Sequence, residues 1–192
     1  MIALVTAVGD PAREKETAAS LCRELLRQVF GDPAVLTYEP SGRPRLSVPG
    51  ADLSISHSQG LVLLALLTKE APPPLALAGA TITLLEGEGE AIGVDVEDAA
   101  GRTADKCLRI ARRFFSPGEA AALQALTPRE QVPAFLALWT QKEAAVKATG
   151  EGLSALSRVD TQTPLPGRIF MTPPPLFAGR EAITAICLLK NA

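Results

Sequence analysis

The sequence predicts an α+β fold built from two similar α/β halves in one chain. Segments with strand character alternate with segments of helical periodicity, and each half begins with a strand and a helix and ends in apolar strands. A chain of 192 residues is long enough for two small halves that share a core. We place the boundary near residue 90, so residues 1–90 form the N-terminal half and residues 91–192 the C-terminal half.

The composition excludes several classes of protein. Apolar residues make up 47% and charged residues 21%, as in ordinary globular proteins. A net charge of −2 argues against a nucleic-acid or membrane-surface partner. Three widely spaced cysteines, Cys22, Cys107 and Cys187, suit neither a disulfide framework nor a zinc site. The first residues lack a basic signal-peptide region, and no apolar run could span a bilayer, so we expect a cytoplasmic protein.

The N-terminal half is expected to begin with a strand at Ile2–Val8, which is apolar and β-branched. The dipeptide Asp10-Pro11 then provides a cap and a first-turn proline for an amphipathic helix over residues 13–30. Further strands are expected at 35–38, within 53–60 and at 61–67, with turns at 40–44 and at Gln59-Gly60. Residues 68–90 contain a proline run and T-I-T-L-L, and we interpret them as a linker followed by an exposed hairpin.

The C-terminal half is expected to open with a strand at residues 92–97. Helices should follow at 102–115, at 116–126 and at 133–150, the last ended by Gly150. Residues 158–192 should supply strands, including one at Ala182–Leu189.

The stretch G-V-D-V-E-D carries two carboxylates, Asp95 and Glu97, on one face of the expected strand. One interpretation is an exposed edge strand with a polar face, although this does not explain the doubled charge. A hard divalent cation such as Mg²⁺ does explain it, because Mg²⁺ prefers carboxylate oxygens and keeps other positions for water or phosphate. A third carboxylate, such as Glu143, would complete a site able to hold a pyrophosphate.

The stretch W-T-Q-K-E-A-A-V-K places Trp139, Glu143 and Lys147 in one stripe of a helix. In one interpretation the tryptophan packs at the edge of the core beside a weakly stabilising surface ion pair. In the other, Glu143 binds a metal and Lys147 a phosphate, both within a cleft.

His57 is the only histidine, and it lies between Ser56 and Ser58 at the end of an expected strand. A single histidine is commonly a structural or surface residue. Together, however, these three small polar side chains are suited to bind phosphate oxygens. A serine-hydrolase triad is disfavoured, because the sequence has no nucleophile elbow.

Five segments follow one another along the chain: G-R-P at 42–44, I-S-H-S at 55–58, G-V-D-V-E at 93–97, F-F-S-P-G-E at 114–119 and W-T-Q-K-E-A-A-V-K at 139–147. In this order they resemble the 4′-phosphopantetheinyl transferase superfamily, specifically its Sfp-type, pseudo-dimeric branch. The resemblance implies a pseudo-two-fold fold within a monomer, with the site at the interface of the halves.

The activity that the resemblance implies is Mg²⁺-dependent transfer of 4′-phosphopantetheine from coenzyme A to a serine of an apo acyl or peptidyl carrier protein. The by-product is adenosine 3′,5′-bisphosphate. Two other functions stay open: a relative that binds coenzyme A or carrier without catalysis, and a Mg²⁺-dependent nucleotide pyrophosphate hydrolase. The sequence specifies neither the carrier nor the choice between Mg²⁺ and Mn²⁺.

The resemblance also implies roles for individual residues. The metal would be held by Asp95, Glu97 and Glu143. Glu143, directly or through a water, would also be the base for the carrier serine, and Lys147 would neutralise or protonate the leaving phosphate. The nucleotide end of coenzyme A, with its 3′-phosphate, would be bound in the N-terminal half by Arg43, Pro44, Ser56 and His57.

Some motif residues have a second interpretation. Arg43 stands where the family usually has lysine, and it offers a planar fork rather than a point charge. Glu119 follows Ser116 by three residues, so it is expected to cap its helix. A cationic cluster is either a solvated helix face or a docking site for an acidic carrier; its members are Arg102, Lys106, Arg109, Arg112 and Arg113.

Overall fold

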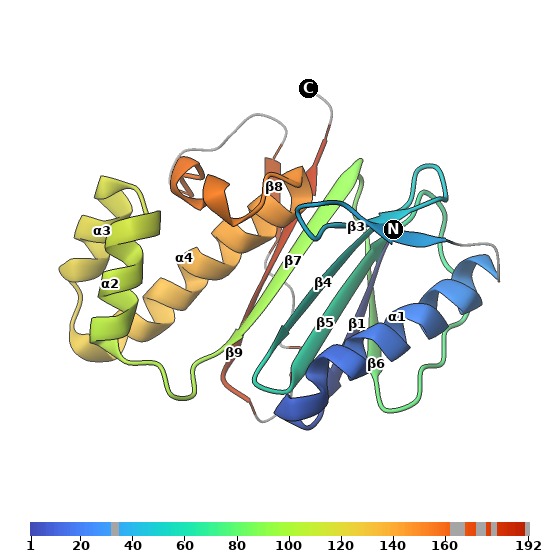
Figure 1. Cartoon of the computed structure of the whole chain (residues 1–192), viewed down its shortest axis with the longest axis horizontal. Coiled ribbons are helices and arrows are strands. Elements are labelled where there is room, and N and C mark those ends of the chain that lie inside the picture. Colours follow the sequence, from blue (N-terminus) through green and yellow to red (C-terminus); the bar gives the residue numbers. More distant parts are fainter. Residues whose placement is uncertain (32–34, 162–167, 172–175, 178–179, 191–192) are drawn as a thin grey trace.

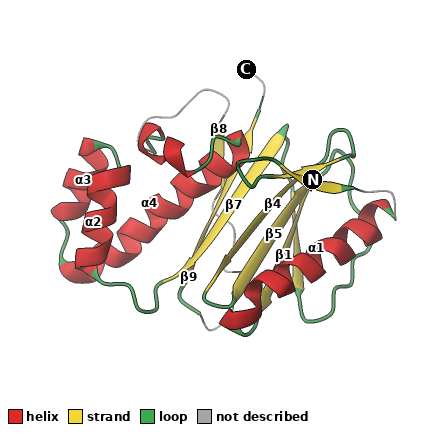
Figure 2. Cartoon of the chain, viewed as in Figure 1, coloured by secondary structure: helices red, strands yellow, loops and turns green. Residues whose placement is uncertain are grey.

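Two antiparallel sheets pack against each other at the centre of the molecule, and helices cover their outer sides (Figures 1 and 2). This computed structural model describes residues 1–31, 35–161, 168–171, 176–177 and 180–190. The mixed architecture confirms the α+β class predicted from the sequence. The pseudo-two-fold relation, the boundary at residue 90 and the monomeric state remain predictions.

The first sheet has the strand order β4-β5-β1-β6, with every neighbouring pair antiparallel. Its strands are β1 (Ile2–Val8), β4 (Asp52–Ser58), β5 (Leu61–Leu67) and β6 (Thr81–Leu85). Helix α1 (Glu14–Phe30) covers one face, and the short 3-10 helix η1 (Pro11–Arg13) leads into it. The Asp10 side chain caps η1 by accepting a hydrogen bond from the backbone N–H of Ala12, as the sequence predicted.

The second sheet has the order β7-β9-β8 and is also antiparallel. Its strands are β7 (Ala91–Asp98), β8 (Arg168–Met171) and β9 (Ala182–Leu189). Three helices and a 3-10 helix belong to this side of the molecule: α2 (Ala104–Phe114), α3 (Pro117–Gln124), α4 (Pro128–Thr149) and η2 (Leu153–Arg158). Figure 1 shows β7 between α4 and β4, at the junction of the two sheets.

Three elements differ from the expectations. T-I-T-L-L forms β6 and pairs with β1 at the sheet edge, so it is no exposed hairpin. A small hairpin of β2 (Leu36–Tyr38) and β3 (Pro44–Leu46) surrounds the turn expected at 40–44, and β3 was not predicted. Helix α4 begins at Pro128 instead of residue 133, because Thr127 and Glu130 form a capping box that the sequence analysis missed.

Strand β5 is buried on both faces, which explains its uninterrupted apolar sequence. Its even-numbered residues, such as Leu64, pack towards α1. Its odd-numbered residues, such as Leu63, pack towards β7 and β9. The core between the sheets is therefore shared by both halves of the chain. Among the described residues, no helix is apolar and long enough to cross a membrane.

Side chains of β4 join the two sheets by hydrogen bonds to the backbone of β7. The backbone N–H groups of Ile92, Val94 and Val96 donate to Asp52 Oδ2 (2.8 Å), Ser54 Oγ (3.0 Å) and Ser56 Oγ (3.3 Å), respectively. Both strands contribute every second residue, as expected where alternate groups point to one side. We call this set of three bonds the seam.

Gly93 allows α4 to lie directly on β7. A Cβ atom at this position would lie 1.9 Å from the carbonyl oxygen of Ala144 and 2.5 Å from the backbone nitrogen of Ala148. Both neighbours are backbone atoms of α4, so no side-chain rotation could relieve the overlap. The small residues Ala144 and Ala148, both fully buried, allow the same close approach from the helix side.

The substitution Gly93→Ala should therefore force α4 away from β7. We expect it to lower the free energy of unfolding by about 3 kcal/mol, the upper part of the range for overpacked cores. Urea-induced unfolding followed by circular dichroism measures this change.

Gly9→Ala is the matched control, because a Cβ at Gly9 meets no atom within 4 Å. Its free energy of unfolding should stay close to that of the wild type. Equal stability of the Gly93→Ala variant and this control would contradict the close packing of α4 on β7.

Candidate active site

One cleft of about 520 Å³ brings together residues from both halves of the chain. Its walls include, from the N-terminal half, Pro44, Ser56 and His57, and from the C-terminal half, Asp95, Glu97, Glu143 and Lys147. These are the residues that the sequence analysis selected, apart from Arg43. Arg43 lines an adjoining cavity of about 290 Å³, whose wall also includes Glu143 and Lys147.

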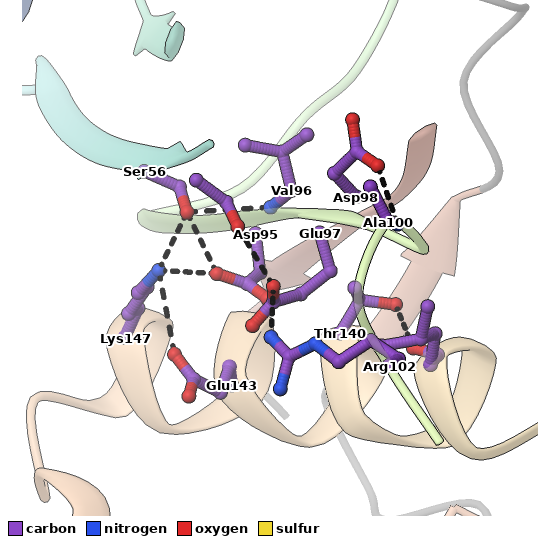
Figure 3. Close-up of polar contacts among 12 residues, drawn as sticks. Ser56, Asp95, Val96, Glu97, Asp98, Ala100, Arg102, Thr140, Glu143 and Lys147 are labelled. Atoms are coloured by element: carbon purple, nitrogen blue, oxygen red, sulfur yellow. Dashed lines mark hydrogen bonds and ion pairs between the residues drawn. The ribbon is translucent and has the colours of Figure 1, made fainter. Parts of the chain in front are cut away.

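Asp95 lies at the centre of the polar contacts in the cleft (Figure 3). Its Oδ1 accepts hydrogen bonds from Ser56 Oγ at 2.7 Å and from Lys147 Nζ at 2.6 Å. Lys147 Nζ also donates to Ser56 Oγ at 3.1 Å. Only 3% of Asp95 is exposed, and its second oxygen, Oδ2, is buried without a hydrogen-bond partner in the described part of the chain.

Glu143 and Lys147 occupy successive turns of α4, with Lys147 Nζ 3.6 Å from Glu143 Oε2. Burial, reinforced by the negative charge of Asp95, raises the pKa of Glu143 to about 7. Burial alone would lower the pKa of Lys147, but Asp95 and Glu143 outweigh it and raise that pKa above its usual value. Lys147 is therefore an ammonium at neutral pH, whereas Glu143 can gain or lose a proton there.

Glu97 points from the same face of β7 as Asp95 but has its own partners (Figure 3). Its Oε2 accepts hydrogen bonds from Ser58 Oγ at 2.9 Å and from Arg102 Nη2 at 2.6 Å. The shared face agrees with the two-residue period of the strand. Arg102, the first member of the cationic cluster, thus neutralises one carboxylate of the cleft.

The carboxylates of the cleft are the type of ligand that a hard cation prefers. Their side chains are not arranged around a common point in this structure. Three carboxylates line one cleft, and the buried Asp95 Oδ2, which has no hydrogen-bond partner among the described residues, could accept a cation. However, within the residues described, no three side chains of the metal-ligating types lie close enough together to hold an ion as they stand. Lys147 and Arg102 instead supply the positive charge beside Asp95 and Glu97.

Arg43 has a structural role that the sequence analysis did not predict. Its guanidinium is buried, donates from Nη2 to Asp52 Oδ2 at 2.8 Å and from Nη1 to the carbonyl oxygen of Ala148. Asp52 belongs to the seam, so Arg43 ties the seam to the end of α4. Its third nitrogen, Nε, is buried and has no hydrogen-bond partner among the described residues.

His57 is paired with a residue that sequence reasoning missed. Its Nδ1 lies 2.9 Å from Glu14 Oε1, across 43 positions of sequence. No local pattern could have revealed this contact, because Glu14 begins a helix and His57 lies in a strand.

Several motif residues lie in the core of the C-terminal half. Glu119 forms the predicted capping box with Ser116 and a fully buried ion pair with Lys142, with Nζ 2.8 Å from Oε2. Burial alone would raise the pKa of Glu119, but Lys142 and hydrogen bonds from Thr161 and Ser116 lower it. Trp139 stacks on Phe135 at the core edge, as its structural interpretation predicted.

Two kinds of comparison relate this chain to known proteins: a match to a family model and similarity to individual relatives. Residues 91–185 match the model of the 4′-phosphopantetheinyl transferase superfamily. A 4′-phosphopantetheinyl transferase of Bacillus subtilis is 32% identical over 138 residues, which cover 70% of this chain and 50% of that relative. The transferase AcpT of Salmonella typhimurium is 32% identical over 144 residues, covering 74% of this chain and 63% of AcpT. The transferase Sfp of Bacillus subtilis is 32% identical over 114 residues, covering 59% of this chain and 40% of Sfp.

The chain belongs to the 4′-phosphopantetheinyl transferase superfamily, and its relatives include Sfp-type members. This confirms the family indicated by the five sequence segments. The matched regions span between 40% and 63% of the length of these three relatives.

The raised pKa of Glu143 makes stability depend on pH in buffer without divalent cations. A carboxyl group with a folded-state pKa above its usual value of 4.5 favours folding at low pH. That contribution is lost as the pH rises from about 4.5 to about 7. Ionised Glu143 should therefore lower the free energy of unfolding at pH 8 by up to about 3 kcal/mol, relative to its value at low pH where the carboxyl group is protonated.

The substitution Glu143→Gln should raise the melting temperature more at pH 8 than at pH 5, measured with a chelator present. Glu88→Gln is the matched control, because that side chain is 92% exposed. An equal effect of Glu143→Gln at both pH values would contradict the raised pKa.

Proposed function

We propose that this protein transfers 4′-phosphopantetheine from coenzyme A to a serine hydroxyl of an apo carrier protein and releases adenosine 3′,5′-bisphosphate. The observation that carries this proposal is the contact of Lys147 with Asp95, Glu143 and Ser56 in one cleft. Each of the three relatives compared above is named a 4′-phosphopantetheinyl transferase. The cleft is formed by both halves of the chain and holds the Lys147 ammonium among carboxylates. This arrangement suits a pyrophosphate substrate.

Glu143 is the proposed acceptor of the serine proton. Its pKa of about 7 lies near working pH, where a general base is most effective. The serine oxygen forms a bond to the phosphorus that carries the pantetheine arm. The bond from that phosphorus to the bridging oxygen breaks, and the serine proton passes to Glu143, directly or through a water.

Lys147 is the proposed partner of the leaving phosphate. Its raised pKa keeps it positively charged, so it can neutralise the negative charge that grows on the bridging oxygen. Its hydrogen bonds to Asp95 and Ser56 come from β7 and β4, and they hold the ammonium in place before substrate binds.

A divalent cation, Mg²⁺ in our proposal, would be held by Asp95, Glu97 and Glu143. When bound, it would neutralise the pyrophosphate and align its oxygens. Asp95 Oδ2 is the proposed ligand atom, because it has no hydrogen-bond partner among the described residues. The salt bridge of Lys147 with Asp95 supports this proposal, because it places a positive charge beside that carboxylate.

The nucleotide end of coenzyme A would lie against residues of the N-terminal half. His57 and Pro44 line the cleft, and Ser56 reaches it from β4. Arg43 would contribute from the wall of the adjoining cavity, since its Nη1 and Nη2 hold Ala148 and Asp52 and its Nε is buried.

The carrier partner would be acidic and would dock on α2. Arg102 links the start of this surface to Glu97 in the cleft. Exposed cations continue along the helix at Lys106, Arg109, Arg112 and Arg113. Such a surface raises the rate of encounter with an acidic partner more than it strengthens the final complex.

Incubation with coenzyme A, Mg²⁺ and an apo acyl or peptidyl carrier should add one phosphopantetheine to the carrier, measured by intact-protein mass. Asp95→Ala should reduce the rate by at least about a hundredfold, because it removes both the expected metal ligand and the partner of Lys147. Glu88→Ala, on the exposed surface, is the control and should leave the rate unchanged.

Three results would contradict the proposal. The first is no mass change across a panel of carriers. The second is calorimetric binding of coenzyme A without transfer, which would indicate a non-catalytic relative. The third is release of adenosine 3′,5′-bisphosphate without any carrier, which would indicate a pyrophosphate hydrolase.

The double substitution Arg109→Glu/Arg112→Glu should raise the KM for the carrier about tenfold, because like charges would then oppose the acidic partner. The KM for coenzyme A should not change. Steady-state kinetics with each substrate varied in turn measures both values.

Arg23→Glu/Lys69→Glu provides the matched control. It changes the net charge by the same amount at exposed positions on other surfaces. A carrier KM that rises equally in both double variants would assign the effect to net charge and remove α2 from the interface.

A further inference from the structure

Glu14 makes two contacts, one with the end of β4 and one with the turn that follows it. Its Oε1 lies 2.9 Å from His57 Nδ1, and its Oε2 accepts a hydrogen bond from the backbone N–H of Gly60 at 2.8 Å. Glu14 is the first residue of α1, whereas His57 lies near the end of β4 and Gly60 in the following turn. The Glu14 side chain is 20% exposed and that of His57 is 30% exposed, so water reaches the pair only partly.

The carboxylate is held in place from several sides. Gly60 adopts φ +81°, a left-handed conformation that favours glycine, and its carbonyl oxygen accepts a hydrogen bond from Gly9 at 2.9 Å. The Asp10 cap fixes the segment that leads into α1. Rotation of the Glu14 side chain would break both of its contacts. Because the Gly60 N–H holds the Glu14 carboxylate, the start of α1 and the turn after β4 together set the orientation of the His57 ring.

This pairing decides which nitrogen of His57 can bind a ligand. Nδ1 donates its proton to Glu14, so Nε2 is the nitrogen left for the cleft, whose wall includes His57. To donate from Nε2 to a phosphate oxygen, the ring must carry protons on both nitrogens. The Glu14 carboxylate is the acceptor for the N–H group at Nδ1, and its negative charge lies beside the ring.

Glu14 also differs from the other acidic residues around the cleft. Asp95, Glu97 and Glu143 are expected to bind cations, and each has a lysine or arginine beside it. Glu14 contacts a histidine and a backbone amide instead. Its neighbour Lys15 lines the cleft together with His57, so this end of the cleft is suited to an anion.

We propose that Glu14 is a positioning residue: it orients His57 so that Nε2 donates to the 3′-phosphate of coenzyme A. The inference rests on the proposed function, because it takes coenzyme A as the substrate. It adds a residue outside the five sequence segments and assigns it to recognition of one particular phosphate.

The test compares coenzyme A with dephospho-coenzyme A, which lacks the 3′-phosphate, in the transfer assay with an apo carrier. Glu14→Gln keeps the size of the side chain and an oxygen that can accept from Gly60, but removes the charge. It should raise the KM for coenzyme A about tenfold, as expected for a weakened charge-assisted hydrogen bond. The kcat should change less than about twofold, and the KM for dephospho-coenzyme A should not change.

Glu16→Gln is the matched control. Glu16 lies in the same helical turn and undergoes the same charge change, but its side chain is 72% exposed and pairs with Arg13. Its two KM values should equal those of the wild type. In the His57→Ala background, Glu14→Gln should have no further effect on the KM for coenzyme A, because both residues act through the same contact.

Some outcomes would overturn the inference while the proposed function stands. One is a Glu14→Gln variant whose KM for coenzyme A equals that of the wild type. Another is an equal rise for coenzyme A and dephospho-coenzyme A, which would mean that Glu14 supports the cleft as a whole. A third is a further rise of KM in the His57→Ala background.

Binding measurements separate this inference from the proposed function. Calorimetry with adenosine 3′,5′-bisphosphate and with adenosine 5′-monophosphate requires no transfer. A tenfold weaker affinity of the Glu14→Gln variant for the bisphosphate alone would support the role of Glu14, even if no carrier were modified. No binding of the bisphosphate to the wild type would overturn both proposals.

Discussion

The seam between β4 and β7 is the constraint on which the site depends. A buried N–H group without a partner costs about 1–3 kcal/mol, so the N–H groups of Ile92, Val94 and Val96 require acceptors. Side chains of β4 provide them, and each oxygen must stand opposite a particular residue of β7. This requirement fixes the register of the two strands, and it places Ser56 beside Asp95. The contact that joins the sheets thus also orients the central carboxylate of the cleft.

Several residues of the sequence segments support the site without reaching into the cleft. Gly93 lets α4 approach β7 closely, which brings Lys147 within 2.6 Å of Asp95. Glu119 and Lys142 form an ion pair with no exposed surface, and loss of one partner would leave a buried charge. These residue types are therefore needed for close packing and for charge pairing. Both determine where α4 lies.

Local patterns predicted the parts of the site that lie within one element. The period of a strand placed Asp95 and Glu97 on one face, and the period of a helix placed Glu143 next to Lys147. Contacts between elements could not be predicted in this way. The pairing of Lys147 with Asp95 spans 52 positions, and that of His57 with Glu14 spans 43. The pairing of β6 was missed for the same reason, since its partner β1 lies at the other end of the N-terminal half.

The seam also has a consequence for the motions of the protein. Successive N–H groups of a strand point to opposite sides, so Ile92, Val94 and Val96 face β4 while the residues between them face β9. A small separation of the two sheets would expose only the first set to water. Amide hydrogen exchange would then alternate along β7, with fast exchange at even positions and slow exchange at odd ones. The exchange rates along β7 would thus measure how often the two sheets separate while each sheet stays folded.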